Sequence, residues 1–109
     1  MSYLWITKRI VKPLNNYKCF GLLKELSIEI NNNNFGLIDN KYYQGMTLQD
    51  NNNVNNNIVW SCTSWDNYLN MKSWEKSNNR KKILNKYNDI IIYEEHSLMF
   101  KETDDTFLL

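Results

Sequence analysis

The chain has 109 residues, of which 42% are apolar, and a formal net charge of +1. This length allows one domain with a hydrophobic core and leaves no room for two domains. The near-neutral charge argues against a nucleic-acid-binding protein, which would carry a basic excess. Two cysteines exclude a disulfide framework. Without a CxxC motif or clustered histidines, no metal site is expected.

The composition is biased toward amino acids with AT-rich codons. The sequence contains 19 Asn, 11 Lys and 10 Ile but no Ala, which indicates an AT-rich genome. Many asparagines then occupy tolerant positions, so a single Asn is weak evidence for a functional site. An Asn-rich loop over residues 49–57 and a tail over residues 103–109 have no role that the sequence reveals.

The sequence pattern also bears on the compartment of the protein. The N-terminal apolar stretch stops at Ile6, which is short for the core of a signal peptide. The longest apolar run elsewhere, over residues 90–93, is too short to cross a bilayer. We therefore expect a cytoplasmic protein with reduced thiols and no membrane partner. The sequence leaves open whether a leader peptide has been removed.

The first half of the chain predicts a strand, a helix and a second strand. Residues 4–11 alternate between two faces that both carry apolar side chains. A helix follows, capped by Asn15 or Asn16, and its apolar stripe consists of Cys19, Leu22, Leu23, Leu26 and Ile30. Residues 31–34 end this helix, and a strand is predicted over residues 37–48.

The second half predicts a strand, a helix and a last strand. Residues 58–63 form the strand, and Ser64 is expected to cap a helix with Trp65 in its first turn. Ser77 has the character of a second cap, so this helix is expected to break or bend there. The last strand is predicted over residues 90–100.

The resulting order, βαββαβ, predicts an α+β fold of the ferredoxin-like type. That fold is a four-stranded antiparallel sheet with both helices on one face. The first and last strands carry apolar residues on both faces, and the two helices cover only one of them. A second copy of the same sheet would cover the other face. We therefore expect a single domain over residues 1–109 that forms a homodimer.

Three segments resemble antibiotic biosynthesis monooxygenase-like domains. Residues 35–38 (FGLI) are similar to the entry of the family's second strand, and residues 58–65 (IVWSCTSW) to its third strand and helix start. Residues 74–80 (WEKSNNR) are similar to the family's W..S..R/H helix break. The segments follow the family's order over nearly the whole chain. The resemblance implies a dimeric α+β barrel.

Members of this family differ in function. Some oxygenate aromatic polyketides without metal or flavin, and others degrade haem. The resemblance therefore implies a cofactor-independent monooxygenase that acts on a small aromatic substrate and needs no cofactor. The haem degraders use an Asn on the first strand and a His on the second helix, whereas the best-matching positions here hold Lys8 and Leu84. Haem degradation by that scheme is disfavoured.

Several side chains are candidates for a site between the helices and the sheet. His96 is the candidate catalytic base, because Glu94 shares its strand face and a carboxylate can orient an imidazole. The alternative is an exposed or hydrogen-bonded strand histidine. Trp74 would form an aromatic wall and Arg80 would contact an anionic or phenolate oxygen. The alternative for Trp74 is core packing, and the alternative for Arg80 is a solvated position on the helix surface.

Three further aromatic side chains are substrate-binding candidates, each with core packing as its alternative: Trp65, Trp60 and Tyr43. The leading function is thus monooxygenation, with the aromatic substrate reducing oxygen. The alternative is a non-enzymatic ligand-binding or stress-associated barrel for haem or another hydrophobic ligand. Oxygen uptake with a hydroxyanthrone separates the two functions.

Overall fold

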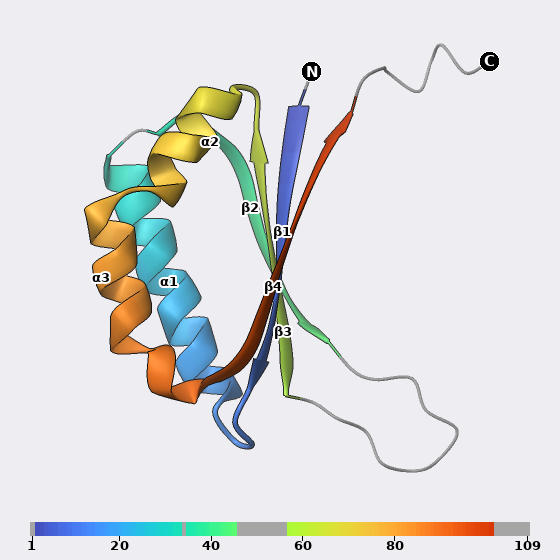
Figure 1. Ribbon diagram of the computed structural model, residues 1–109, viewed down its shortest axis with the longest axis vertical. Helices are drawn as coiled ribbons and strands as arrows, with labels where there is room; N and C mark the ends of the chain where they lie inside the picture. Colours follow the sequence, from blue (N-terminus) through green and yellow to red (C-terminus); the bar gives the residue numbers. More distant parts are fainter. Residues whose placement is uncertain (1, 34, 46–56, 102–109) are drawn as a thin grey trace, which may run out of the picture.

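The computed structural model describes residues 2–33, 35–45 and 57–101 (Figure 1). The predicted βαββαβ order is confirmed, with the second helix divided in two. The elements are β1 (Ser2–Val11), α1 (Asn16–Asn32), β2 (Leu37–Gly45), β3 (Ile58–Trp65), α2 (Tyr68–Glu75), α3 (Asn78–Lys86), the short 3-10 turn η1 (Asn88–Ile90) and β4 (Ile91–Lys101).

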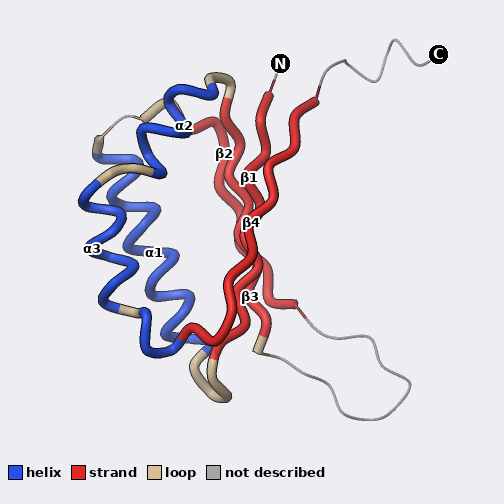
Figure 2. Tube along the Cα trace, in the orientation of Figure 1, coloured by secondary structure: helices blue, strands red, loops and turns tan. Residues whose placement is uncertain are grey.

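The four strands form one antiparallel sheet in the order β2-β3-β1-β4. The helices all lie on one face of this sheet, and within this chain no element of the described ranges covers the other face (Figures 1 and 2). The α+β ferredoxin-like prediction is therefore confirmed, and the homodimer stays a prediction. None of the described helices is long and apolar enough to span a bilayer.

The alternation along β1 sets which side chains meet the helices. Thr7, Arg9 and Val11 are buried beneath the helices, whereas Lys8 on the open face lies over the Trp60 ring at 5.6 Å. Burial of Arg9 is unusual because a guanidinium on the inner face must find charge or hydrogen-bond partners there. This strand therefore brings a cation into the space between the layers.

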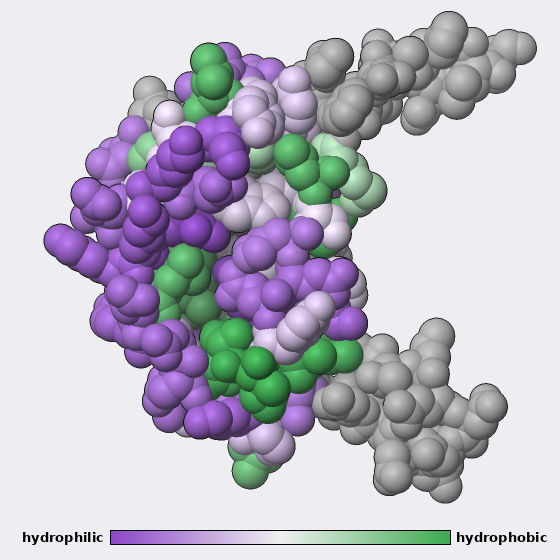
Figure 3. Space-filling model, in the orientation of Figure 1, coloured by the Kyte–Doolittle hydropathy of each residue, from purple (hydrophilic) through white to green (hydrophobic). Residues whose placement is uncertain are grey.

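Helix α1 packs its predicted stripe against the sheet. Cys19, Leu22, Leu23 and Ile30 are buried, while hydrophilic side chains cover the outward surface of the helices (Figure 3). Asn15 stands at the N-cap position, but its side chain makes no capping hydrogen bond and its Nδ2 donates to the Pro13 carbonyl at 2.9 Å instead. The position of the cap is confirmed and its capping bond is not.

The start of the second helix differs from the prediction. Ser64 does not cap it, and Trp65 is the last residue of β3, where it pairs with both Tyr3 and Leu37. Two strand partners hold position 65 in the sheet, so the helix begins later, after Asn67, whose side chain accepts from the Asn70 N–H at 3.1 Å.

The other predicted boundaries are closer to the structure. Ser77 caps α3, as expected, by accepting from the Arg80 N–H at 3.4 Å. Strand β4 begins one residue after the predicted position, because Ile90 belongs to η1. Residues 46–48 of the predicted second strand, residues 49–56 of the loop and the tail 103–109 lie outside the described residues.

Candidate functional site

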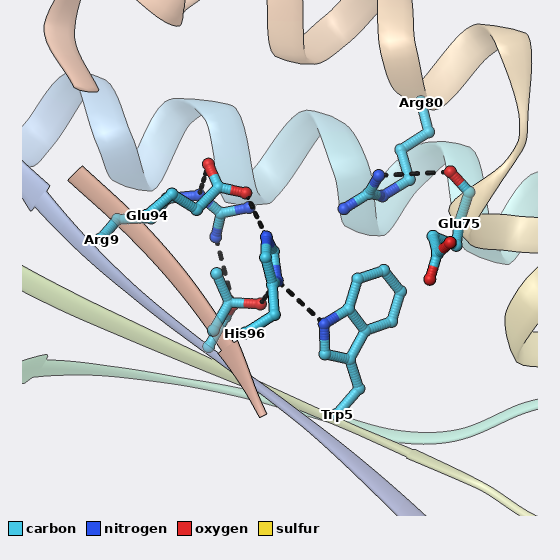
Figure 4. A network of polar contacts seen from close by, with 8 residues as sticks. Trp5, Arg9, Glu75, Arg80, Glu94 and His96 are labelled. Carbon is cyan, nitrogen blue, oxygen red and sulfur yellow. Dashed lines mark hydrogen bonds and ion pairs between the residues drawn. The ribbon is translucent and has the colours of Figure 1, made fainter. Parts of the chain in front are cut away.

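A chain of polar contacts runs along the inner face of the sheet at the junction of β1 and β4 (Figure 4). His96 Nε2 lies 2.5 Å from Glu94 Oε1, and Glu94 Oε2 lies 3.4 Å from Arg9 Nε. The strand register produces this order, because Arg9 pairs with Glu94 and Thr7 pairs with His96. Glu94 therefore contacts the His96 ring, and the role of His96 as a base stays a prediction.

The contacts around His96 fix which ring nitrogen carries the proton. Trp5 Nε1 and Thr7 Oγ1 each lie 3.0 Å from His96 Nδ1. An indole N–H can only donate, so Nδ1 accepts from it and Nε2 carries the hydrogen that is donated to Glu94. The ring is therefore neutral and presents a basic nitrogen toward Trp5 and Thr7.

Glu94 is held in its ionised form. The hydrogen bond with His96 is the largest cause that lowers the pKa of the Glu94 carboxyl, and the positive charges of Arg9 and Arg80 lower it further, against the opposing effect of burial. A carboxylate in this position stabilises the positive charge that forms on an imidazole when it takes up a proton. The arrangement is suited to general-base chemistry.

His96 stands at the edge of an open cleft between α2 and the β1–β4 edge of the sheet. The cleft has a volume of about 230 Å³. Its walls combine rings and apolar side chains with a few polar groups: Trp5, Tyr68, Met71, Lys72, Glu75, His96, Ser97 and Leu98. The His96 side chain is 40% exposed, so a ligand in the cleft can reach it.

A second, smaller space lies deeper, between the helices and the centre of the sheet. Its volume is about 40 Å³. The polar side chains that line it include Thr7, Arg9, Asn40, Tyr42, Ser61, Thr63 and Arg80, and the apolar ones are Trp5, Leu23, Leu26, Ile30 and Trp74. We call this space the interior cavity. The Trp5 ring borders both spaces, so it forms the wall between the cleft and the interior cavity.

Arg80 reaches this wall from the helix side. Its guanidinium lies over the Trp5 ring, 4.8 Å from the centroid, and Nη1 donates to the Glu75 carbonyl at 3.3 Å. The side chain points from α3 into the space above the sheet, toward the Arg9–Glu94–His96 chain (Figure 4). Burial is the main cause that lowers the pKa of Arg80, and the charge of Arg9 lowers it further.

The structure brings some of the predicted site residues together and separates others. Trp74 and Arg80 line the interior cavity. Trp65 is fully buried in a core cluster with Ile30, Met71 and Trp74, and it lines neither the cleft nor the interior cavity. Trp65 is therefore a core residue, and its alternative of core packing is the one that its burial supports.

Trp60 and Tyr43 lie on the opposite face of the sheet. They are neighbours across β2 and β3, and they line an open apolar hollow with Ile6 and Cys62. The thickness of the sheet separates them from His96, so within one chain they cannot touch the same small ligand. They belong to the open face.

Sequence reasoning did not include Arg9, Trp5 or Thr7 among the site residues. The available signal was the strand alternation, which places Arg9 on the same face as Val11 and Thr7. A charged side chain at an inward strand position requires partners. Among the described residues, no three His, Cys, Asp or Glu side chains are grouped as metal ligands.

Comparisons with known proteins bear on the fold. No family model matches the chain, and no curated protein matches its sequence. Solved structures do match it. A conserved protein from Methanosarcina mazei Go1 is 21% identical, with 94% of each chain covered and a TM-score of 0.73. A candidate antibiotic biosynthesis monooxygenase from Chloroflexus aurantiacus J-10-fl is 15% identical, with 95% of this chain and 96% of that chain covered and a TM-score of 0.68.

A third match names an activity. A variant of SnoaB, a cofactor-independent oxygenase from Streptomyces nogalater, is 8% identical, covers 95% of this chain and 96% of its own, and has a TM-score of 0.72. The chain has the antibiotic biosynthesis monooxygenase-like fold. Because the sequence identities are low, this likeness concerns the arrangement of the backbone alone. The side chains of this chain must carry the argument for function.

Proposed function

We propose that the protein is a homodimeric, cofactor-independent monooxygenase that oxidises a small aromatic substrate in the cleft beside His96. The observation that carries this proposal is the Arg9–Glu94–His96 chain, which ends in a basic nitrogen at the edge of an aromatic cleft. Structural neighbours described as monooxygenases or as a cofactor-independent oxygenase support the same reaction class.

The reaction requires a substrate that can be made electron-rich by loss of a proton. A hydroxyanthrone is such a substrate: its ring CH₂ group becomes C=O, and one O₂ gives that oxygen atom and one water. His96 Nδ1 removes a proton, and the resulting anion passes one electron to O₂. The two radicals combine to form a peroxide, which is protonated by the imidazolium. Loss of the second C–H proton then breaks the O–O bond and releases water.

The side chains of this chain supply the base, the orientation and a dry environment. A substrate hydroxyl or C–H that approaches through the cleft would replace the Trp5 N–H at His96 Nδ1, which has its lone pair there. Glu94 holds the ring in this tautomer and stabilises the imidazolium. Tyr68, Met71 and Leu98 offer apolar and aromatic surface for a planar ring.

The open face of the sheet is proposed to pair with a second copy. Tyr43, Tyr93 and Met99 are each about half exposed there, and the hollow beside Trp60 is lined mainly by apolar side chains. An apolar sheet face of this kind favours burial against another protein surface. A second sheet placed face to face would cover it and would keep the cleft, on the helix side, accessible.

Oxygen uptake with 1,8-dihydroxyanthrone tests the reaction, with heat-denatured protein as the control for spontaneous oxidation. We expect His96→Gln to lower kcat by about 100-fold or more, because a positioned base contributes at least that much. Asp89→Asn is the matched control, since Asp89 is an exposed carboxylate that lines neither the cleft nor the hollow on the open face. Ligand binding without oxygen uptake by the wild-type protein would refute the enzyme and favour a ligand-binding barrel.

A further inference from the structure

Two buried arginines border the interior cavity, which is an unusual concentration of positive charge in so small a domain. Arg9 is 2% exposed and Arg80 is 8% exposed. They come from opposite layers, because Arg9 belongs to β1 and Arg80 to α3. Buried guanidiniums require compensating charge and hydrogen-bond acceptors.

The protein satisfies only part of the hydrogen-bonding capacity of these two side chains. Each guanidinium has five N–H groups. Arg9 Nη1 donates to Ser61 Oγ at 3.3 Å, and Arg9 Nε lies 3.4 Å from Glu94 Oε2 without forming a hydrogen bond. Arg80 makes one side-chain hydrogen bond to the described part of the chain, to the Glu75 carbonyl. Among the described residues, Arg9 Nε is the one guanidinium nitrogen that is buried without a hydrogen-bond partner.

The charges around the cavity do not balance. Glu94 is the one carboxylate in contact with either guanidinium among the described residues. The Glu75 carboxylate pairs instead with Lys72 at 3.0 Å, and His96 is neutral in the tautomer that its contacts define. The two guanidiniums thus share one carboxylate in direct contact, while the charge of Glu75 acts on Arg80 without an ion pair. A monoanion in the cavity would give the second guanidinium a partner of its own.

The shape of the cavity restricts this anion further. A volume of about 40 Å³ accepts a group of a few heavy atoms, and the planar fork of a guanidinium matches two oxygens of one carboxylate. Leu26, Ile30 and Trp74 provide an apolar wall for the carbon that bears it.

We propose that the interior cavity binds the carboxylate group of the substrate between Arg9 and Arg80. This inference rests on the proposed function for the reaction that follows, and it names the substrate class as an aromatic carboxylic acid. The Arg80 guanidinium carbon lies over the Trp5 ring, and Arg9 lines the same cavity. The ring of the same substrate reaches the cleft beside His96 only when Trp5 moves aside, because the Trp5 ring is the wall between the two spaces.

The test uses acetate, the smallest carboxylate with a carbon body, and needs no turnover. Sodium acetate replaces sodium chloride at constant ionic strength, and the Trp5 indole N–H signal is followed by NMR. We expect a saturable shift that acetamide, the uncharged analogue, does not produce. Arg80→Gln should weaken acetate binding by about tenfold or more. Lys82→Gln, which removes an exposed cation from the same helix, should leave it unchanged.

Three results would overturn the inference: a shift that does not saturate, an equal response to acetamide, or unchanged acetate binding by Arg80→Gln. If that variant does not fold, Arg9→Lys provides the second test, because it keeps the charge and loses the planar fork. Oxygen uptake without acetate binding would remove this inference and leave the proposed function intact. Acetate binding without oxygen uptake would refute the proposed function and leave the carboxylate site of the interior cavity intact.

Discussion

Replacement of Trp74 by alanine tests how much the packing of this side chain contributes to the stability of the fold. The ring is 4% exposed and belongs to a core cluster with Ile30, Trp65 and Met71. It also meets the Phe35 ring edge to face at 5.2 Å between centroids. Removal therefore eliminates both apolar burial and an aromatic pair.

The expected magnitude follows from these contacts. Truncation of a buried tryptophan to alanine lowers the free energy of unfolding by about 3–5 kcal/mol, and an aromatic pair contributes about 0.5–1.5 kcal/mol of such a loss. One side of the Trp74 ring borders the interior cavity and already lacks packing partners. We therefore expect a loss near the lower end of the range, about 3 kcal/mol.

Urea unfolding at one fixed protein concentration measures this loss, because a dimer's midpoint depends on concentration. Leu69→Ala is the matched control on the same helix, since Leu69 is 73% exposed, and it should change stability by less than about 0.5 kcal/mol. A loss below about 1 kcal/mol for Trp74→Ala, with ligand stabilisation abolished, would refute the packing argument. Trp74 would then be a ligand-contacting residue.

Three further outcomes are expected. The pKa of Glu94 is lowered in the folded protein, mainly by its hydrogen bond with His96. Its contribution to stability is therefore complete above the ordinary value of 4.5 and is lost as the pH falls through the lower folded value. Glu94→Gln should flatten the acid limb of a stability–pH profile. Light scattering should give about twice the chain mass of 13.1 kDa, with more than ~1,200 Å² buried between the two copies. Trp60→Glu places a charge on the open face and should give the monomer. A wild-type monomer at micromolar concentration would contradict the proposed interface. Burial raises the pKa of both thiols, so Cys19 should resist alkylation until unfolding, whereas Cys62 on the open face should react faster on dilution of the dimer.

The architecture was predictable because its signals are periodic. Alternation over β1 and the helical stripe from Cys19 to Ile30 both follow from the need to bury one face. The start of α2 was not predictable from the same kind of signal. Ser64 followed by Asp66 has the chemistry of a helix start, yet Tyr3 and Leu37 hold Trp65 in the sheet. Distant strand partners override a local cap.

The candidate site was predictable only in part. The pairing of Glu94 with His96 follows from their two-residue spacing on one strand. The role of Arg9 depends on cross-strand register, which aligns it with Glu94 and which no local pattern specifies. The sequence does not distinguish Tyr43 and Trp60 from Trp74, because all three are aromatic residues in or next to predicted strands and helices. Which face they occupy follows from the register of β2 with β3.

Trp5 links the protonation of His96 to the position of an aromatic wall. Its indole N–H donates to Nδ1 only while that nitrogen keeps its lone pair. Once Nδ1 takes up a proton, two N–H groups face each other, and the indole must leave or turn. Thr7 Oγ1 lies 3.0 Å from the same nitrogen and has lone pairs to accept the new N–H. The indole hydrogen bond and a protonated Nδ1 therefore exclude each other, so a substrate has to displace the wall between cleft and interior cavity before it passes its proton to His96.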